Sequence, residues 1–275
     1  MVPKRWMWRC LVPSLVASVA LVVAAPSAAL AAPVRDGVIN GCTIMDNPTP
    51  THYSLCPNAD LSGAELNGVN LSYAKLNGAH LDGASLMSAS LIGTHLEHAD
   101  LRGAYLSGAE LKNAYLNGAH LDGAHLERIS SVSSATRLDG AHLDGAHLEF
   151  AYFNDATLNG ATLYGATLGG AVFNGAHLEG VSLDDQYLGR ASFRDAYLNG
   201  AHLNGAHLDF AFLKGAHLNS AQLGGAYLNG AHLDFADLRG AYLTDAHLTN
   251  VSWYNTICQD GQLTMPKGTL SSCPT

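Results

Sequence analysis

The sequence predicts a four-sided coil of stacked repeats, and two superimposed periods indicate it. Leu or Phe recurs at every fifth position from Phe153 to Phe173, and Ala stands two residues before each. A period of five fits neither an amphipathic helix nor an ordinary strand, and such a strict short repeat is typical of a solenoid. The large central residues Phe153, Phe173 and Phe193 recur at every fourth repeat, and Trp253 falls in the same phase further along the chain. Four repeats per turn would stack these aromatic side chains in one core column.

Residues 1–31 have the three parts of a secretory signal peptide. Basic residues precede an apolar run from Leu11 to Ala25, and Ala29-Leu30-Ala31 supplies a small-residue cleavage site. The apolar run is shorter than the stretch of roughly 20 residues that a spanning helix needs. We therefore expect cleavage near Ala31, a secreted chain, and no membrane span after cleavage.

The mature chain is acidic. Residues 1–31 contain three basic and no acidic residues, so removing them leaves 11 basic residues against 23 acidic ones and a net charge of −12 with His neutral. A strongly negative surface disfavours direct binding of nucleic acid through its phosphates. It is compatible with binding of cations and with mimicry of a polyanion.

Four cysteines remain in the mature chain, and an even number in an exported protein suggests disulfides. Two of them precede the repeats and two follow, so they fall at opposite ends of the predicted stack. Because a disulfide requires Cα atoms within about 7 Å, the arrangement predicts the pairs Cys42–Cys56 and Cys258–Cys273.

The regular repeat divides the mature chain into segments. Central Leu or Phe residues run unbroken from Leu61 to Leu126 and again from Leu138 to the closing Trp253. The interval from Leu126 to Leu138 is two residues longer than two repeats, which indicates a loop on a continuous coil. We predict an N-terminal cap, a first array, a register-shifting loop, a second array and a C-terminal cap at 32–58, 59–126, 127–137, 138–253 and 254–275.

The interior of such a coil is narrow and filled by the alternating Ala and Leu side chains. We therefore expect no internal cavity and no cleft. Catalysis needs a pocket that brings a nucleophile, a base and an orienting group together, so the sequence predicts a protein that is not an enzyme and needs no cofactor.

Many repeats follow the order small, polar, Leu, polar, Gly, as in Ala64–Gly68 and Ala236–Gly240. This pattern resembles the pentapeptide-repeat family over most of the mature chain. The resemblance implies an all-β fold, a right-handed, four-sided parallel β-helix. The number of repeats between residues 59 and 253 predicts about nine to ten coils. The flanking segments 41–44, 56–61 and 253–261 are similar to those of exported bacterial members with cysteine-bearing caps.

Well-understood members of this family protect DNA gyrase by resembling acidic duplex DNA. The resemblance therefore implies a DNA mimic that inhibits or protects gyrase as one alternative function. This chain differs in its export signal, in its cap cysteines and in its frequent His or Tyr where the family commonly has Asp or Asn. These differences favour a structural or binding module that contacts a protein or a cell-envelope polymer.

The residue directly before each central Leu, here called the outward position, carries 12 of the 14 histidines. Positions four repeats apart stack, so one column begins with Asp60, His80, Asp100 and His120. If the two additional residues loop out, His120 stacks on His142 and His125 on His147. Imidazoles with carboxylates between them suit zinc, copper or nickel, so weak transition-metal binding is a second alternative. The competing interpretation is a ladder of stacked rings without a bound ion.

Exposed aromatic residues give a further candidate for a partner surface. Phe150 and Phe210 share one column, and Tyr152 and Phe212 share another. Clustered surface aromatics mark sites of interaction. The competing interpretation is that a Phe at a corner covers the neighbouring turn.

Overall fold

The computed structural model describes residues 37–130, 135–264 and 273. By its contacts the chain divides into two units, Met1–Ala32 and Pro33–Thr275. The described residues all belong to the second unit. The predicted signal peptide at 1–31 lies outside them.

A short antiparallel hairpin opens the described part of the chain. It consists of β1 (Val38–Ile39) and β2 (Cys42–Thr43). The two residues between them, Asn40 and Gly41, both have positive φ, 47° and 82°, as a tight two-residue hairpin turn requires. The Asn40 side-chain amide donates to the carbonyl oxygen of Asp60 (3.0 Å), which ties the hairpin to the first repeats.

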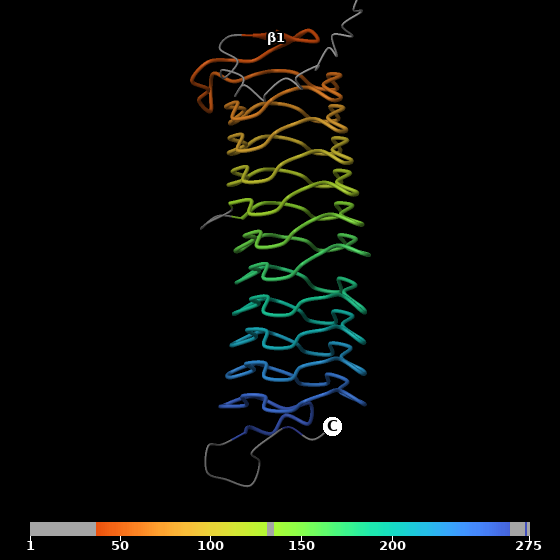
Figure 1. Ribbon diagram of the computed structural model, residues 1–275. Coiled ribbons are helices and arrows are strands. Elements are labelled where there is room, and N and C mark those ends of the chain that lie inside the picture. Colours follow the sequence, from red (N-terminus) through yellow and green to blue (C-terminus); the bar gives the residue numbers. More distant parts are fainter. Residues whose placement is uncertain (1–36, 131–134, 265–272, 274–275) are drawn as a thin grey trace, which may run out of the picture. The chain divides into compact units, whose positions relative to one another are not determined.

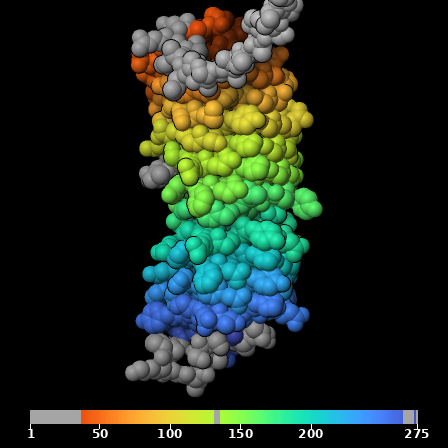
Figure 2. Space-filling view, in the orientation of Figure 1, coloured from red at the N-terminus to blue at the C-terminus, as the bar shows by residue number. Residues whose placement is uncertain are grey.

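From residue 55 to residue 257 the chain winds in stacked coils (Figure 1). Outward residues pair in parallel with residues one coil later, as Asp60 does with His80. The Leu61 N–H donates to the His80 carbonyl oxygen (2.7 Å), and the His80 N–H donates to that of Ala59 (2.9 Å). Within the described ranges the chain contains no helix, as expected from a five-residue period. The colours in Figure 2 follow one another as bands, so each coil contacts mainly its neighbours in sequence.

Two inward positions of every repeat fill the interior: the central residue and the small residue two before it. Nearly all of these side chains are fully buried. Phe153, Phe173 and Phe193 stack in the core with 5.3 Å between successive ring centroids. Thr94 replaces Ala at one small position, and its buried hydroxyl donates to the Leu71 carbonyl oxygen (2.8 Å). This hydroxyl is accommodated inside because the backbone satisfies it.

The register shift is shorter than the predicted segment 127–137. Ser130 still pairs with Glu110, one regular coil away, and Ile129 is fully buried at a small position. Arg137 pairs with Tyr115, which adds two residues to that coil. The predicted start of the shift at residue 127 is wrong because the regular pairing continues to Ser130. Ile129 differs from the usual Ala but occupies the same buried small position. The columns continue across the shift.

The repeat begins before residue 59, where the first array was expected to start. Leu55 pairs in parallel with Lys75, and the Cys56 N–H donates to the Lys75 carbonyl oxygen (2.9 Å). Ser54 and Cys56 are buried as Ala and Leu are elsewhere. Cys56 thus takes a central position in the first coil, and its sulfur lies 2.04 Å from that of Cys42.

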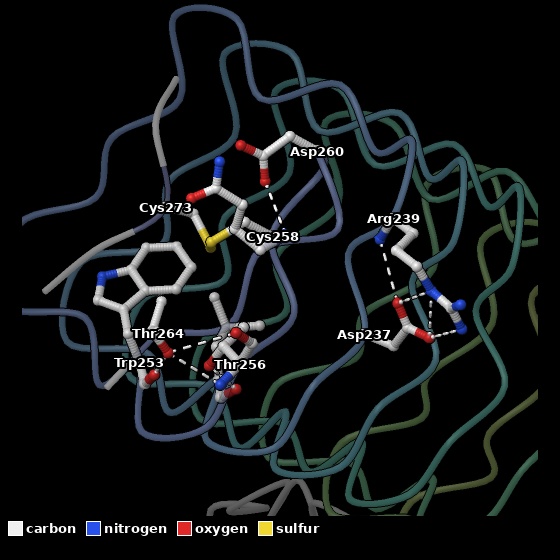
Figure 3. Close-up of a disulfide and its surroundings, with 10 residues drawn as sticks. Asp237, Arg239, Trp253, Thr256, Cys258, Asp260, Thr264 and Cys273 are labelled. Atoms are coloured by element: carbon white, nitrogen blue, oxygen red, sulfur yellow. Dashed lines mark hydrogen bonds and ion pairs between the residues drawn. A yellow bond between two sulfur atoms is a disulfide. The ribbon is translucent and has the colours of Figure 1, made fainter. Parts of the chain in front are cut away.

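The C-terminal end also carries a disulfide-bonded Cys at a central position (Figure 3). The repeat therefore extends past its predicted end at Trp253, whose side chain is buried. Cys258 takes the next central position, and its sulfur lies 2.08 Å from that of Cys273. Thr256 takes the small position, and its N–H donates to the Thr264 hydroxyl oxygen (2.9 Å). The Thr264 hydroxyl in turn donates to the Trp253 carbonyl oxygen. The chain therefore folds back over the last core layer.

The stack is not closed along its whole length, contrary to the expectation of a filled coil without a cleft. A cleft of about 970 Å³ opens between residues 161–169 and residues 182–187 of the next coil. In Figure 1 the spacing between successive coils widens at this level, in the green part of the ribbon. The small position of the second of these coils holds Gln186 instead of Ala.

Candidate functional site

The outward residues form ladders of stacked rings on the sides of the coil. Each lies between two inward residues of an extended segment, so its side chain points to solvent. Successive rings are nearly parallel, with centroids 4.4–4.8 Å apart in the His and Tyr pairs. The ladder Tyr187–His207–Tyr227–His247 spans four coils. Because the ring faces contact one another, a partner meets the ring edges, which carry hydroxyl and imidazole nitrogen atoms.

The predicted metal column is present as a continuous parallel ladder. Asp60, His80, Asp100 and His120 pair in order, and His120 pairs with His142 across the register shift. The rings of His120 and His142 stack at 4.8 Å. In the column one repeat further along the coil, His125 stacks on His147 at 4.6 Å. The structure therefore brings these side chains together in two neighbouring columns.

The carboxylates of the first column already have partners. The Arg102 guanidinium donates to Asp100 from Nε (2.8 Å) and from a second nitrogen. These bonds hold the pKa of the Asp100 carboxyl below its usual value. The hydrogen bonds from Ser62 similarly lower the pKa of Asp60. A carboxylate that is already satisfied by a guanidinium is a poor ligand for a metal ion.

Two groups of three potential ligands occur among the described residues, and each includes a carboxylate that the sequence prediction missed. They are His80–Asp82–Asp100 and His125–Glu127–His147, each with ligand atoms within 4.8 Å of one another. Asp82 and Glu127 stand two residues after a histidine. Residues two apart in an extended segment lie on one face, so this spacing was the available signal.

Of the two groups, His125, Glu127 and His147 form the better candidate metal site. The Nδ1 atom of His125 lies 3.1 Å from a Glu127 oxygen, and the Ser107 hydroxyl donates to the other oxygen (2.6 Å). Burial raises the pKa of Glu127, but the bonds from Ser107 and His125 outweigh it, so the net shift is downward and the carboxylate stays charged. Zinc–nitrogen bonds are about 2.1 Å, so rings stacked at 4.6 Å must tilt toward each other to share an ion.

The four aromatic residues of the predicted partner surface do not form one patch. Phe150 and Phe210 belong to the same column but lie three coils apart. Both have a positive φ of 58°, and their rings lie over Gly170 and Gly230, where an added Cβ would approach to 2.7 and 2.6 Å. Each corner Phe therefore depends on a Gly in the next coil, as the alternative interpretation expected. Both rings nevertheless remain more than half exposed.

The other two aromatic residues occupy outward positions in one column. Phe212 stacks on His232 (5.3 Å), and the Arg194 guanidinium lies 5.1 Å from its ring. Tyr152 pairs with Val172 and is 43% exposed. Of the four aromatic residues, Phe210 and Phe212 are thus the pair next to the four-coil ladder, because they follow His207 in the sequence.

Comparisons with known proteins agree with this geometry. A family profile described as pentapeptide repeats matches residues 56–128 and 134–252 in overlapping copies. The chain belongs to the pentapeptide-repeat family. Membership implies the right-handed direction of the β-helix, and the helix-free, parallel-bridged coils of the described residues fit it.

Solved structures of pentapeptide-repeat proteins are also similar to the chain. HetL, involved in heterocyst differentiation in Nostoc sp. strain PCC 7120, is 32% identical, with 76% of this chain and 91% of HetL covered and a TM-score of 0.31. QnrB1, a plasmid-mediated fluoroquinolone resistance protein, is 18% identical over 71% of this chain and 90% of its own, with a TM-score of 0.36. A thylakoid lumen protein from Arabidopsis thaliana is 26% identical over 43% of this chain and 70% of its own, with a TM-score of 0.23. None of the curated proteins compared with the chain matches it.

In the described part of the chain, no helix has the length and hydropathy that a membrane crossing requires. The two cysteine pairs at disulfide distance fit an oxidising environment.

Proposed function

We propose that the chain is an exported, non-catalytic binding module of about nine to ten coils with a disulfide at each end. The observation that supports this proposal is the ladder Tyr187–His207–Tyr227–His247, whose rings are held 4.4–4.6 Å apart. Rings fixed by stacking lose little side-chain entropy when they bind. The ladder is therefore a preorganised row of hydrogen-bonding edges.

The partner that fits this surface is a hydroxyl-rich polymer of the cell envelope. Tyr hydroxyls and imidazole nitrogens donate and accept hydrogen bonds, as sugar hydroxyls do. Phe210 stands at the corner that follows His207 and adds an exposed apolar contact next to the row. A charged polymer of phosphates is disfavoured by the negative charge of the mature chain.

Co-sedimentation of residues 32–275 with isolated, insoluble envelope polysaccharide tests this proposal. We expect the wild type to bind, and a His207→Ala, Tyr227→Ala variant to bind about tenfold more weakly, which corresponds to about 1.4 kcal/mol. The matched control is His177→Ala, Tyr197→Ala, which removes the same residue types from another ladder. Equal losses in both variants, or no binding by the wild type, would refute the assignment. Binding to a purified envelope protein instead would identify a protein partner.

A second proposal is weak zinc binding at His125, Glu127 and His147, supported by their mutual proximity. Neutral imidazole is the ligand form, so uptake should be present near pH 7.5 and weaken below about pH 6. Calorimetric titration with zinc should show the tightest site lost in a His125→Ala, His147→Ala variant. The control variant His120→Ala, His142→Ala removes a stacked pair in which the Asp122 carboxylate lies 3.9 Å from His120. If all three proteins take up zinc identically, the histidines form a ladder without a metal function.

A further inference from the structure

Asn followed by Gly is the dipeptide at which a protein chain most readily modifies itself. The Gly nitrogen attacks the carbonyl carbon of the Asn side chain, and Gly has no side chain that hinders this approach. Nine Asn–Gly pairs occur in the chain, and Asn40–Gly41 of the hairpin is the one outside the coils. The other eight occupy the corners that follow a central residue. Their Asn residues are Asn67, Asn77, Asn117, Asn159, Asn174, Asn199, Asn204 and Asn229.

The coil protects seven of these eight pairs through the Gly N–H. In each of the seven the N–H donates to a carbonyl oxygen one coil later, over 2.8–3.0 Å. A nitrogen whose proton is held in the backbone ladder must first be released before it can act as a nucleophile, and this release requires local opening of the ladder. The regular fold therefore suppresses the reaction that its repeated Asn–Gly sequence favours.

Gly160 is the exception. The repeat predicts that its N–H donates to the Glu179 carbonyl oxygen, but it has no acceptor among the described residues. The ladder is intact just before this point, where the Leu158 N–H donates to His177 (2.8 Å). The N–H groups of Leu163 and Leu168 also lack an inter-coil acceptor. Gly160 thus stands at the first missing bond of the interruption that contains the cleft.

Asn159 also differs from its counterparts in exposure. Its side chain is exposed, whereas the Asn side chains of the seven bonded pairs are half-buried. Its Oδ1 atom accepts from the Glu179 N–H (3.1 Å), as that of Asn174 does from the Arg194 N–H (3.0 Å). Because this side-chain contact is shared, the unbonded Gly N–H and the greater exposure are what distinguish Asn159, and Asn174 is its matched control.

We propose that Asn159–Gly160 is a site of spontaneous deamidation at which isoaspartate forms. The Gly160 nitrogen loses its proton to solvent and forms a bond to Cγ of Asn159. The bond from Cγ to Nδ2 breaks, and this nitrogen takes a proton from solvent and leaves as ammonia. Water then opens the cyclic imide at either carbonyl, which gives aspartate or isoaspartate. The reaction needs no partner molecule, so the site stands whether or not the ladder binds an envelope polymer.

The modification changes the coil next to the cleft. Both products add one negative charge, and isoaspartate routes the main chain through Cβ, which lengthens this corner by one carbon. The Oδ1 atom that accepts from the Glu179 N–H becomes part of the altered main chain. We therefore expect hydrogen exchange at the Glu179 amide to be faster in the isoaspartate form than in the unmodified chain.

Peptide mapping by mass spectrometry of residues 32–275, kept folded in mildly alkaline buffer, tests the proposal. Asn159 should convert at least about tenfold faster than the Asn of each of the seven bonded pairs, because attack in those pairs first requires a ladder bond to open. Both aspartate and isoaspartate should appear at residue 159, since the cyclic imide opens at either carbonyl. Aspartate alone would contradict attack by the Gly160 nitrogen.

Two variants and the unfolded chain are the controls. Asn159→Gln should lose the fast conversion, because its longer side chain must close a larger ring, and Asn174→Gln should retain it. In the urea-unfolded, reduced chain all eight pairs should convert at similar rates, since the ladder no longer distinguishes them. A folded chain in which Asn159 converts no faster than the other seven, or an equal lead of Asn159 in the unfolded chain, would overturn the inference.

Discussion

Replacing Phe173 by Ala is expected to lower the free energy of unfolding by about 3–5 kcal/mol. Phe173 is 2% exposed and lies between Phe153 and Phe193 at 5.3 Å from each. The neighbouring rings belong to coils that are fixed by their own backbone ladders, so they cannot collapse into the space left behind. Urea denaturation with intact disulfides measures the change.

The matched control for this variant is Tyr242→Ala. Tyr242 is aromatic and is 59% exposed, and surface substitutions of this kind usually change stability by no more than about 0.5 kcal/mol. A loss below about 1 kcal/mol for Phe173→Ala would mean that the three rings do not form a packed core column.

Removing either disulfide is expected to cost about 3 kcal/mol, because each closes a loop of similar length, with sequence separations of 14 and 15. Cys56 and Cys258 each hold a central core position in a terminal coil. Replacing the Cys258–Cys273 pair by Ala should therefore loosen the C-terminal coil first, since each coil contacts only its neighbours.

Limited proteolysis and urea denaturation of the two double variants, Cys42→Ala, Cys56→Ala and Cys258→Ala, Cys273→Ala, measure this effect. Each serves as the other's control, because each should expose cleavage sites only at its own end. The two losses should add to within about 0.5 kcal/mol when combined. Early cleavage in the central coils, or no loss of stability, would contradict a stabilising role at the ends.

The regular part of the fold was predictable because the side-chain pattern and the backbone pattern repeat together. The five-residue period predicted the inward Leu and Ala, and the recurrence at every fourth repeat predicted which rings stack. The pairing of His120 with His142 followed from treating the two additional residues as a loop. Errors arose where another residue type takes a regular position. Ile129 in place of Ala and Cys56 in place of Leu concealed the true ends of the arrays.

The cleft could not be predicted from the regular pattern, because Gln186, which lines it, takes a position that the repeat usually gives to Ala. Gln186 stands at a position where a polar residue either turns outward or stays between the coils, and the pattern alone does not decide this. The observed choice is set by the Ala166 and Gly165 backbone groups that its amide satisfies. The metal groups were only partly foreseen, since Asp82 and Glu127 do not lie in the histidine columns.

The most direct test of an exported binding module is peptide mapping, without reduction, of the chain recovered from the culture medium of its producing cells. We expect a chain that begins near residue 32 and contains the crosslinks Cys42–Cys56 and Cys258–Cys273. We also expect this chain to leave supercoiling by DNA gyrase unaffected. An unprocessed chain with reduced cysteines that stays in the cytoplasm and inhibits gyrase would contradict the proposed export and favour the DNA-mimic alternative.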